Sequence, residues 1–244
     1  MTVVQHIDPV QASFVGGRTL EVFAETPRLN RWLYSKLAPH VRGEVLEIGS
    51  GIGNLSGFIV EGATRAVLTD MELHYLEALT ARFAGDSRVT VAFYDLDRAP
   101  SPEISSRRFD TIVAVNVIEH IRDDVGLVNR LSALLNPGGK LVVYVPACPF
   151  AYGTLDRALG HHRRYTTASL AKLLADAGLA PISPSYVNLF GLLGWTLNGR
   201  LLRRERLSHR QLALFEKLLP IFRLEDLVRL PIGLGVYTAA TKPR

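Results

Sequence analysis

Short apolar runs alternate with segments of helical periodicity through most of this 244-residue chain. Runs rich in valine, isoleucine and leucine, each bounded by polar or turn-forming residues, predict buried strands. These strands are expected at residues 44–48, 65–69, 89–93, 111–115, 140–145, 182–189 and 235–241. Helices are expected after the first strand to about residue 60, and at 71–83, 123–135 and 166–177. The alternation predicts one α/β domain over residues 1–244, with a mainly parallel sheet covered by helices on both faces.

Two further segments carry apolar periodicity outside this alternation. Residues 1–40 are interpreted as an N-terminal helical cap, with one or two helices over 18–37 that break near Pro27. Residues 191–231, the insertion, mix leucines with eight basic and four acidic residues, and so hold +4 of the chain's net charge of +5. This pattern predicts a basic amphipathic helical hairpin. Four interpretations stay open: a solvated face over the core, contact with an anionic membrane surface, a lipid-like acceptor, or a dimer contact.

The first predicted strand runs into a glycine-rich turn. Glu47 is followed by Gly49, Gly51 and Gly53 at alternate positions, and a helical segment then begins. Glycines accept positive φ and let a ligand approach the backbone closely, while a helix N-terminus attracts polar or anionic groups. The dinucleotide fingerprint G-x-G-x-x-G fails at its third glycine, where Asn54 stands. The turn therefore predicts a ligand site that differs from the nicotinamide type.

Polar side chains also follow the next three predicted strands. Asp70, Asp95 and Asn116 stand at or near the ends of these strands, as Glu47 does in the first. The carboxyl ends of parallel strands meet at one edge of a sheet, and ligands bind there. An acid after the second strand suits ribose hydroxyls. The alternatives are a helix N-cap for Asp70 and a structural turn for Asp95.

Five motifs within residues 43–147 occur in a fixed order. They are VLEIGSGIGNLS, VLTD, VAFYDLD, FDTIVAVNVIEHI and LNPGGKLVVYVPA. With these motifs the chain resembles a class I S-adenosylmethionine-dependent methyltransferase. The resemblance implies a Rossmann-like, seven-stranded, mainly parallel sheet with an antiparallel last strand, and residues 41–147 as the cofactor-binding core. It also implies S-adenosyl-L-methionine as the cofactor.

The resemblance further implies roles for the residues at the strand ends. Asp70 would bind the ribose hydroxyls and Met71 would pack against adenine. Asp95 would meet the adenine amino group, with a backbone contact from Leu96, and Asn116 would lie beneath the sulfonium. The methionine part would be surrounded by Glu47, Gly49, Ser50, Gly51 and Gly53, with Asn54 as a further expected contact.

Residues 148–165, the acceptor loop, follow the fifth predicted strand and are rich in histidine and arginine. Histidine accepts protons near neutral pH, and the planar guanidinium of arginine suits carboxylates and phosphates. The pattern D-x-x-x-G-H-x-R-R-Y, from Asp156 to Tyr165, resembles a subgroup of small methyltransferases thought to act on sugar, lipid-linked or natural-product acceptors. The alternative is a surface loop whose arginines pair with acids of the fold.

Two sets of candidate residues follow from this loop and from the fourth-strand motif. The candidate general bases are His120, His161 and His162. The candidate acceptor contacts are Arg163, Arg164 and Tyr152. No metal site is predicted, because adjacent histidines lack the spacing and the supporting carboxylates of a metal signature.

The predicted function is methyl transfer to an oxygen or nitrogen atom of a small-molecule, sugar or lipid-linked acceptor. One form of this prediction takes the acceptor to be anionic. The alternatives are a nicotinamide-dependent oxidoreductase and a non-catalytic, membrane-associated cofactor-binding protein. A nucleic-acid methyltransferase is disfavoured, because the sequence lacks a base-flipping motif and an RNA-binding appendage. No nucleic-acid partner is therefore expected, and the chain is expected to be a monomer or a homodimer.

Composition narrows the protein class only modestly. Hydrophobic residues make up 48% of the chain, which is enough for a large core, and the single Cys148 excludes a disulfide framework. No signal peptide and no apolar stretch of membrane-spanning length is recognised. The expected location is cytoplasmic, with the insertion as a peripheral contact at the inner membrane surface, and the expected role is small-molecule biosynthesis.

Overall fold

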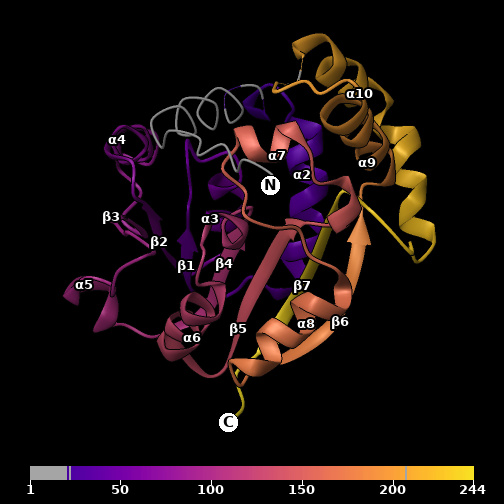
Figure 1. Cartoon of the computed structure of the whole chain (residues 1–244). Helices are drawn as coiled ribbons and strands as arrows, with labels where there is room; N and C mark the ends of the chain where they lie inside the picture. The colour runs from indigo at the N-terminus through magenta and orange to yellow at the C-terminus, as the bar shows by residue number, and fades with distance from the viewer. Residues whose placement is uncertain (1–20, 22, 207) are drawn as a thin grey trace, which may run out of the picture.

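The computed structural model describes residues 21, 23–206 and 208–244. Within them, seven strands form one sheet in the order β3-β2-β1-β4-β5-β7-β6 (Figure 1). The strands are β1 (Glu44–Ile48), β2 (Arg65–Asp70), β3 (Val89–Phe93), β4 (Phe109–Val115), β5 (Leu135–Pro146), β6 (Ala180–Val187) and β7 (Gly235–Thr241). All seven predicted strands are confirmed, and with them the Rossmann-like fold expected of a class I methyltransferase.

The strand directions bring the predicted site residues to one edge of the sheet. β1, β2, β3, β4 and β5 pair in parallel, whereas β7 runs antiparallel between β5 and β6. Pro146 at the end of β5 and Val187 at the end of β6 both align with Gly235 at the start of β7. The carboxyl ends of the first six strands therefore lie on one side, and the prediction of an antiparallel last strand is confirmed.

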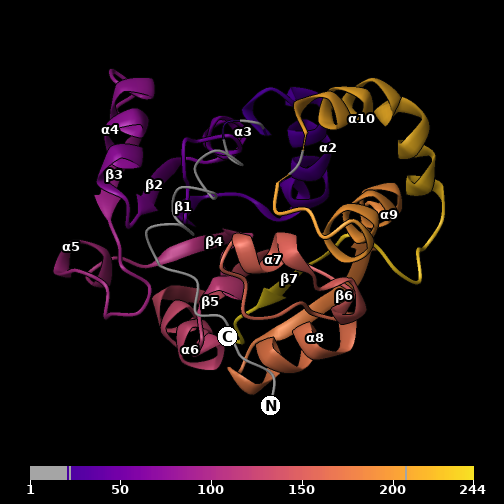
Figure 2. The ribbon, with the colours of Figure 1, turned by 45° about the horizontal axis from the view of Figure 1, so that its top comes forward.

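Helices cover both faces of the sheet, because alternate strand residues point to opposite sides. Val45 belongs to one buried cluster and its neighbour Leu46 to the other. The Leu46 cluster includes side chains of α5 (Pro102–Ser105), α6 (Asp124–Leu134) and α8 (Thr167–Asp176). The Val45 cluster includes side chains of α2 (Pro27–Leu37), α3 (Ser56–Gly62), α4 (Leu73–Arg82) and α10 (His209–Phe222). Figure 2 shows α6 and α8 across the sheet from α2 and α3.

β5 begins five residues before its predicted start. The sequence Asn-Pro-Gly-Gly at 136–139 predicts only a helix stop, and α6 does end at Leu134. The chain then enters the sheet through the glycines: Gly138, at φ 78°, donates its N–H to Lys242 O at 2.9 Å. A Cβ at Gly139 would lie 3.0 Å from Phe109 O, so the missing side chain lets β5 approach β4. Gly138 and Gly139 therefore serve strand pairing, since α6 has already ended at Leu134 and Leu135 is extended.

The remaining segments surround the carboxyl edge of the sheet. The acceptor loop contains η3 (Pro149–Ala151) and α7 (Thr154–Ala158). The insertion region contains α9 (Leu189–Thr196), the π-helix η4 (Leu197–Leu201), α10 and η5 (Arg223–Leu227), and lies beyond β6 and β7 (Figure 1). The predicted helix break near Pro27 is confirmed, since Pro27 is the first residue of α2. Residues 1–20 and 22 of the predicted cap lie outside the described residues.

Candidate active site

The glycine turn after β1 encloses a buried carboxylate. Glu47 is 5% exposed, and its Oε2 accepts hydrogen bonds from the hydroxyls of Ser50 at 3.0 Å and Ser56 at 2.5 Å. Burial raises the pKa of Glu47 to about 7, against the effect of these two hydroxyls. Gly49, Gly51 and Gly53 all have positive φ. The turn therefore needs glycine and holds a carboxyl group that titrates near neutral pH.

Asp70 joins the end of β2 to this turn. Its Oδ2 accepts the N–H of Gly51 at 2.8 Å, and its Oδ1 accepts the N–H of Glu72 at 3.0 Å. Burial raises the pKa of Asp70, and the two backbone donors oppose that rise. The carboxylate thus holds the glycine turn in place and also accepts the N–H of Glu72, the residue before α4. Its predicted ribose contact stays a prediction. The alternative interpretation of Asp70 as a helix N-cap is wrong, because Glu72 is the N-cap of α4.

The other expected cofactor residues follow β2, β3 and β4 at the same edge. Met71 is 56% exposed, and Leu96 is buried. Asp95 forms a local turn, because its Oδ1 accepts the N–H of Asp97 at 3.0 Å. Asn116 is exposed at φ 52°, and its N–H donates to Tyr144 O at 2.8 Å, which extends the β4–β5 ladder by one residue. These residues follow strands whose carboxyl ends share one edge of the sheet, and their cofactor contacts stay predictions.

The acceptor loop is organised around one buried carboxylate, Asp156. Its Oδ1 lies 2.7 Å from Arg164 Nε and 3.0 Å from His161 Nδ1. Its Oδ2 accepts the N–H of Gly153 at 2.9 Å and the indole N–H of Trp195 at 3.1 Å. Although burial opposes ionisation, the hydrogen bond with His161 and the charge of Arg164 lower the pKa of Asp156 to about 2. Asp156 is therefore an anion that holds the loop together.

The predicted acceptor contacts differ in their access to solvent. Arg164 is buried, and its Nη1 also donates to Ala147 O at 2.8 Å, so it supports the loop from inside. Arg163 keeps 35% of its side chain exposed and pairs with Asp124 at 2.7 Å. The Tyr152 hydroxyl donates to His161 O at 2.7 Å. Both arginines pair with acids of the fold, as the alternative interpretation expected, but only Arg163 is open to a ligand.

The candidate bases are also divided by burial. His161 is 8% exposed, whereas His120 and His162 are exposed. Burial, together with Arg122 and Arg163, lowers the pKa of His162. A neutral imidazole at the surface of the loop can accept a proton.

Sequence reasoning omitted Glu119 from the candidate residues. Its side chain is 0% exposed, and neither carboxylate oxygen has a hydrogen-bond partner among the described residues. Burial raises the pKa of Glu119 to about 8. The only sequence signal was its place beside His120 after β4. An unpartnered buried carboxyl group is costly and therefore indicates a role.

Comparison with known proteins identifies the family. The family model described as a methyltransferase domain matches residues 22–183. A probable S-adenosylmethionine-dependent methyltransferase of Mycolicibacterium smegmatis is 31% identical over 177 residues, which cover 70% of this chain. The match covers 66% of that relative, so this chain spans just under two thirds of its length. The chain belongs to the class I S-adenosylmethionine-dependent methyltransferases.

Solved structures show the same fold. In the Haloferax volcanii complex of the Trm112 methyltransferase activator with a methyltransferase, one chain superposes with a TM-score of 0.65. It is 15% identical, and the match covers 98% of this chain and 100% of that one. Haemonchus contortus phosphoethanolamine N-methyltransferase 2, in complex with S-adenosyl-L-methionine, superposes with a TM-score of 0.59 at 20% identity. The match covers 89% of this chain and 53% of that one. The family model and the curated relative, rather than these structures, argue against a nicotinamide cofactor at the glycine turn.

The residues at the carboxyl edge fit S-adenosylmethionine, the cofactor of this family. A Cβ at Gly49 would lie 2.6 Å from Val117, so the turn stays close to β4 and free of side chains. Glu47 offers an ionisable carboxyl group to a cofactor that carries positive charge on sulfur and nitrogen. Asp70, at the end of β2, offers carboxylate oxygens for hydroxyl groups. When bound, the cofactor supplies a methyl group activated by the sulfonium charge.

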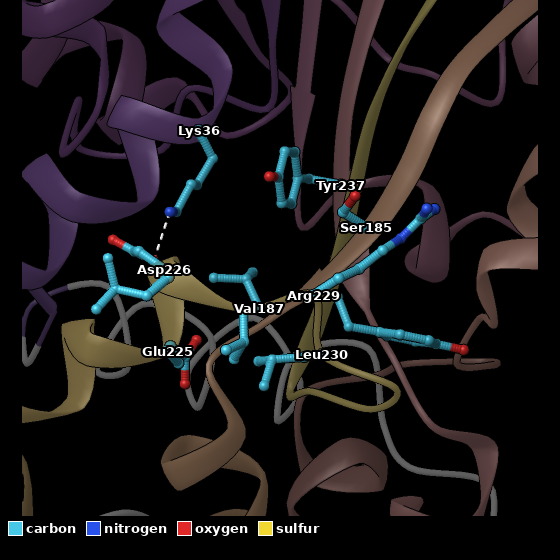
Figure 3. Close-up of a pocket in the computed structure, with 11 residues that line it drawn as sticks. Lys36, Ser185, Val187, Glu225, Asp226, Arg229, Leu230 and Tyr237 are labelled. Atoms are coloured by element: carbon cyan, nitrogen blue, oxygen red, sulfur yellow. Dashed lines mark hydrogen bonds and ion pairs between the residues drawn. The ribbon is translucent and has the colours of Figure 1, made fainter.

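A separate pocket of about 370 Å³ opens between α2, the β6–β7 edge and the end of the insertion (Figure 3). Its lining includes Lys36, Glu225, Asp226, Arg229 and Tyr237. None of the residues named above for the cofactor or the acceptor lines it. Lys36 and Asp226 form an ion pair at 2.5 Å across this pocket, so it belongs to the junction of the insertion with the core.

Among the described residues, none of the helices has both the length and the apolarity needed to cross a bilayer.

Proposed function

We propose that this chain transfers a methyl group from S-adenosylmethionine to an oxygen or nitrogen atom of an anionic, lipid-linked acceptor at an anionic membrane surface. The observation that carries the acceptor class is the surface of the insertion. Its basic side chains are exposed, three of its four acidic side chains contact the rest of the fold, and leucines project between the charges.

The basic side chains of the insertion are exposed, whereas most of its acidic side chains are held by partners elsewhere in the fold. All eight basic residues are exposed: Arg200, Arg203, Arg204, Arg206, Arg210, Lys217, Arg223 and Arg229. Glu216 instead accepts the N–H groups of Arg28 and Leu29 at the start of α2, at 2.7 and 3.1 Å. Glu225 accepts the N–H groups of Asn188 and Leu189 at the start of α9, at 2.5 and 3.0 Å.

Asp226 is the third acidic side chain that contacts the core. Its carboxylate accepts the indole N–H of Trp32 at 2.9 Å and pairs with Lys36. The remaining acidic residue, Glu205, is exposed. The surface that a partner meets is therefore more basic than the net charge of +4 indicates, and it is complementary to anionic headgroups.

Apolar side chains on the same segment are exposed at helical spacing. Leu193, Leu197 and Leu201 are 60%, 47% and 71% exposed and follow each other at intervals of four residues. Residues four apart lie on one face of a helix. A second exposed set follows along α10 and η5: Leu214, Ile221, Leu224, Leu227 and Val228. Exposed leucines among cations are typical of helices that lie in a membrane interface.

The insertion is joined directly to the acceptor loop. The Thr154 hydroxyl donates to Gly199 O at 2.9 Å, and Arg200 donates to Phe150 O. Trp195 reaches Asp156, the carboxylate at the centre of the loop. An acceptor whose lipid part lies against the insertion therefore brings its polar end to the loop, beside the carboxyl edge of the sheet.

Within the loop the proposed roles follow from exposure. Arg163 contributes positive charge for an anionic group on the acceptor, and His162 accepts the proton released by the attacking oxygen or nitrogen. Arg164 and Asp156 hold the loop in shape from inside. Most of the rate acceleration comes from alignment, because the cofactor is already activated.

The test combines binding and chemistry. Vesicles of phosphatidylglycerol and phosphatidylcholine are sedimented with the protein at several salt concentrations, beside vesicles of phosphatidylcholine alone. Separately, methyl-labelled S-adenosylmethionine is incubated with a bacterial lipid extract, and the label is followed into the organic phase. We expect binding to the anionic vesicles that weakens with salt, and label in the lipid fraction.

Two variants make the result specific. Leu197→Gln with Leu201→Gln should lower vesicle binding about tenfold, since each change removes apolar area that the membrane would bury. Ile182→Gln, on β6 and 40% exposed, is the matched control and should change nothing. Equal binding by all three proteins, or label that stays in a water-soluble product, would overturn the lipid-linked acceptor. Dimers in ultracentrifugation that the double variant splits would assign the leucines to a subunit contact.

A further inference from the structure

Three side chains with metal-ligating atoms meet between the acceptor loop and the end of β4. Glu119 and His120 come from η2 (Ile118–His120), and His161 comes from the acceptor loop. One ligand atom of each lies within 4.8 Å of the other two. The adjacent pair His161 and His162 carried no metal signature, but the fold pairs His161 with a histidine and a carboxylate that lie about forty positions earlier in the chain.

Glu119 supplies an independent sign that a ligand belongs here. Its carboxyl group is fully buried, and neither oxygen has a hydrogen-bond partner among the described residues. The nearest ligating atom is His161 Nε2, 3.9 Å from Oε1. A buried carboxyl group without a hydrogen-bond partner loses its hydration, and the charge of Arg164 compensates for only part of that loss, since the pKa of Glu119 stays raised. A bound cation between these atoms would compensate for that loss.

His161 is already oriented as a metal ligand. Its Nδ1 lies 3.0 Å from Asp156 Oδ1, which turns Nε2 toward Glu119. Asp156 is itself held by Arg164, the Gly153 N–H and Trp195. A carboxylate that accepts from one ring nitrogen fixes the tautomer and leaves the other nitrogen as a donor to a metal. Arg164 pairs with Asp156, and its charge also acts on Glu119 without a hydrogen bond between the two side chains.

His120 provides the opening of this cluster. It is exposed, whereas Glu119 and His161 are buried. The two imidazole rings lie edge to face with their centroids 4.8 Å apart. A cation can therefore enter from solvent past His120, and this exposed side chain is free to turn toward it.

We propose that Glu119, His120 and His161 bind one divalent transition-metal cation of the zinc class. Two imidazoles and one carboxylate are a donor set that leaves a fourth position open in zinc sites. Ligand atoms in a tetrahedral zinc site lie about 3.4 Å apart, given bonds of about 2.1 Å. Glu119 Oε1 and His161 Nε2, now 3.9 Å apart, would therefore approach each other by about 0.5 Å, and the exposed His120 would move by roughly an ångström to join them.

This inference goes beyond the proposed methyl transfer and does not depend on the lipid-linked acceptor. The open position would lie beside the carboxyl edge of the sheet, where it could polarise an acceptor oxygen. His161 then serves the cation, and His162 remains the proton acceptor.

The experiment measures metal binding by the full chain. Protein freed of metal with a chelator is dialysed against Zn²⁺, and bound metal is counted by mass spectrometry; Co²⁺ is added in parallel and its visible absorption recorded. We expect one equivalent of Zn²⁺ and the intense absorption of four-coordinate Co²⁺. Glu119→Gln, His120→Ala and His161→Ala should each weaken binding at least about tenfold, and Asp156→Asn should weaken it by about 10- to 100-fold through orientation of His161.

The matched control is His162→Ala, which removes the adjacent histidine and should leave metal binding unchanged. Each variant is also titrated with S-adenosylhomocysteine to show that the cofactor half is folded. If the buried changes at Glu119 or His161 prevent folding, the exposed His120→Ala decides. Less than one fifth of an equivalent of metal, or binding that His162→Ala reduces as much as His120→Ala does, would overturn the site.

Discussion

Trp195 of the insertion donates its indole N–H to Asp156 of the acceptor loop at 3.1 Å. Both side chains are buried, and the ring of Trp195 also lies 5.1 Å from the guanidinium carbon of Arg164. A single tryptophan thus contacts both members of the buried ion pair and connects two segments that are about forty residues apart.

Trp195→Phe removes the hydrogen bond and keeps most of the ring packing. We expect the free energy of unfolding to fall by about 1–3 kcal/mol, because a hydrogen bond to a buried carboxylate is lost. The affinity for S-adenosylhomocysteine should stay unchanged, since the cofactor residues lie in the first half of the chain. Urea denaturation and calorimetric titration check the two statements. A loss of cofactor affinity would contradict this division between the two halves.

Arg163 and Arg164 allow a partly exposed ion pair to be compared with a buried one. Arg164→Met leaves Asp156 without its cation in the interior, and should cost about 3–5 kcal/mol of unfolding free energy. Arg163→Met breaks a partly exposed pair with Asp124 and should cost less than about 1 kcal/mol. Chemical denaturation of the two variants is the comparison. Equal effects would mean that Asp156 does not need Arg164.

Gly153 and Gly194 test two different effects of glycine: close packing of the loop backbone against the insertion, and a lower helix propensity. A Cβ at Gly153 would lie 2.5 Å from Gly199 O, so Gly153→Ala should push the loop away from the insertion and cost about 1–3 kcal/mol. Gly194 lies inside α9 with open space around it, so Gly194→Ala should stabilise the helix by about 0.5–1 kcal/mol. Thermal unfolding should move in opposite directions for the two variants. A shift of the same sign would refute the packing argument.

Glu47 predicts a pH dependence of stability with a definite sign. Its pKa is raised from 4.5 to about 7 in the folded chain, so the folded chain holds this proton more tightly than the unfolded chain. The contribution of Glu47 to stability is therefore fully favourable below about pH 4.5 and declines as the pH rises to about 7. The decline is on the order of 3 kcal/mol.

Glu47→Gln tests this sign, because glutamine resembles the protonated form at every pH. The free energy of unfolding of the variant, relative to that of the native chain, should rise between pH 5 and pH 8 and then level off. Urea titrations at four pH values across this range measure the difference. A constant difference would show that the carboxyl group is ionised throughout.

Asp70→Asn addresses the cofactor site. The amide can accept only one of the two backbone N–H groups that Asp70 accepts, from Gly51 and Glu72. The turn should loosen, and the affinity for S-adenosylhomocysteine should fall about 10- to 100-fold, equivalent to one or two lost hydrogen bonds. Asp86→Asn, in an exposed pair with Arg88, is the control. Unchanged titration curves for both variants would remove Asp70 from the site.

The sheet and its carboxyl edge could be predicted because their signals are local. Strands such as β1 and β4 are unbroken apolar runs, and the glycine turn needs residues that adopt positive φ. The start of β5 was predicted five residues too late, because the Gly-Gly pair was interpreted as a helix stop, whereas it lies within the strand. Local sequence cannot distinguish these two roles of glycine.

The candidate site was less predictable, because its contacts join distant segments. Glu216 is 188 residues from the N–H of Arg28 that it accepts, and no periodicity reveals this contact. The isolation of Glu119 likewise depends on the acceptor loop, whose His162 N–H donates to Glu119 O at 2.8 Å. The sequence indicated that the arginines of the loop were important, but only the fold assigns Arg164 to the interior and Arg163 to the surface.

The position of β7 has a consequence for the order of assembly. β5 and β6 do not pair with each other, since each hydrogen-bonds to β7. β7 is also the last strand along the chain, so β6 has no neighbour in the sheet until residues 235–241 have been synthesised. A nascent chain can therefore complete the cofactor half first, whereas β6 and the insertion that follows it join the sheet only when β7 is present. The half that would meet the acceptor is thus built last.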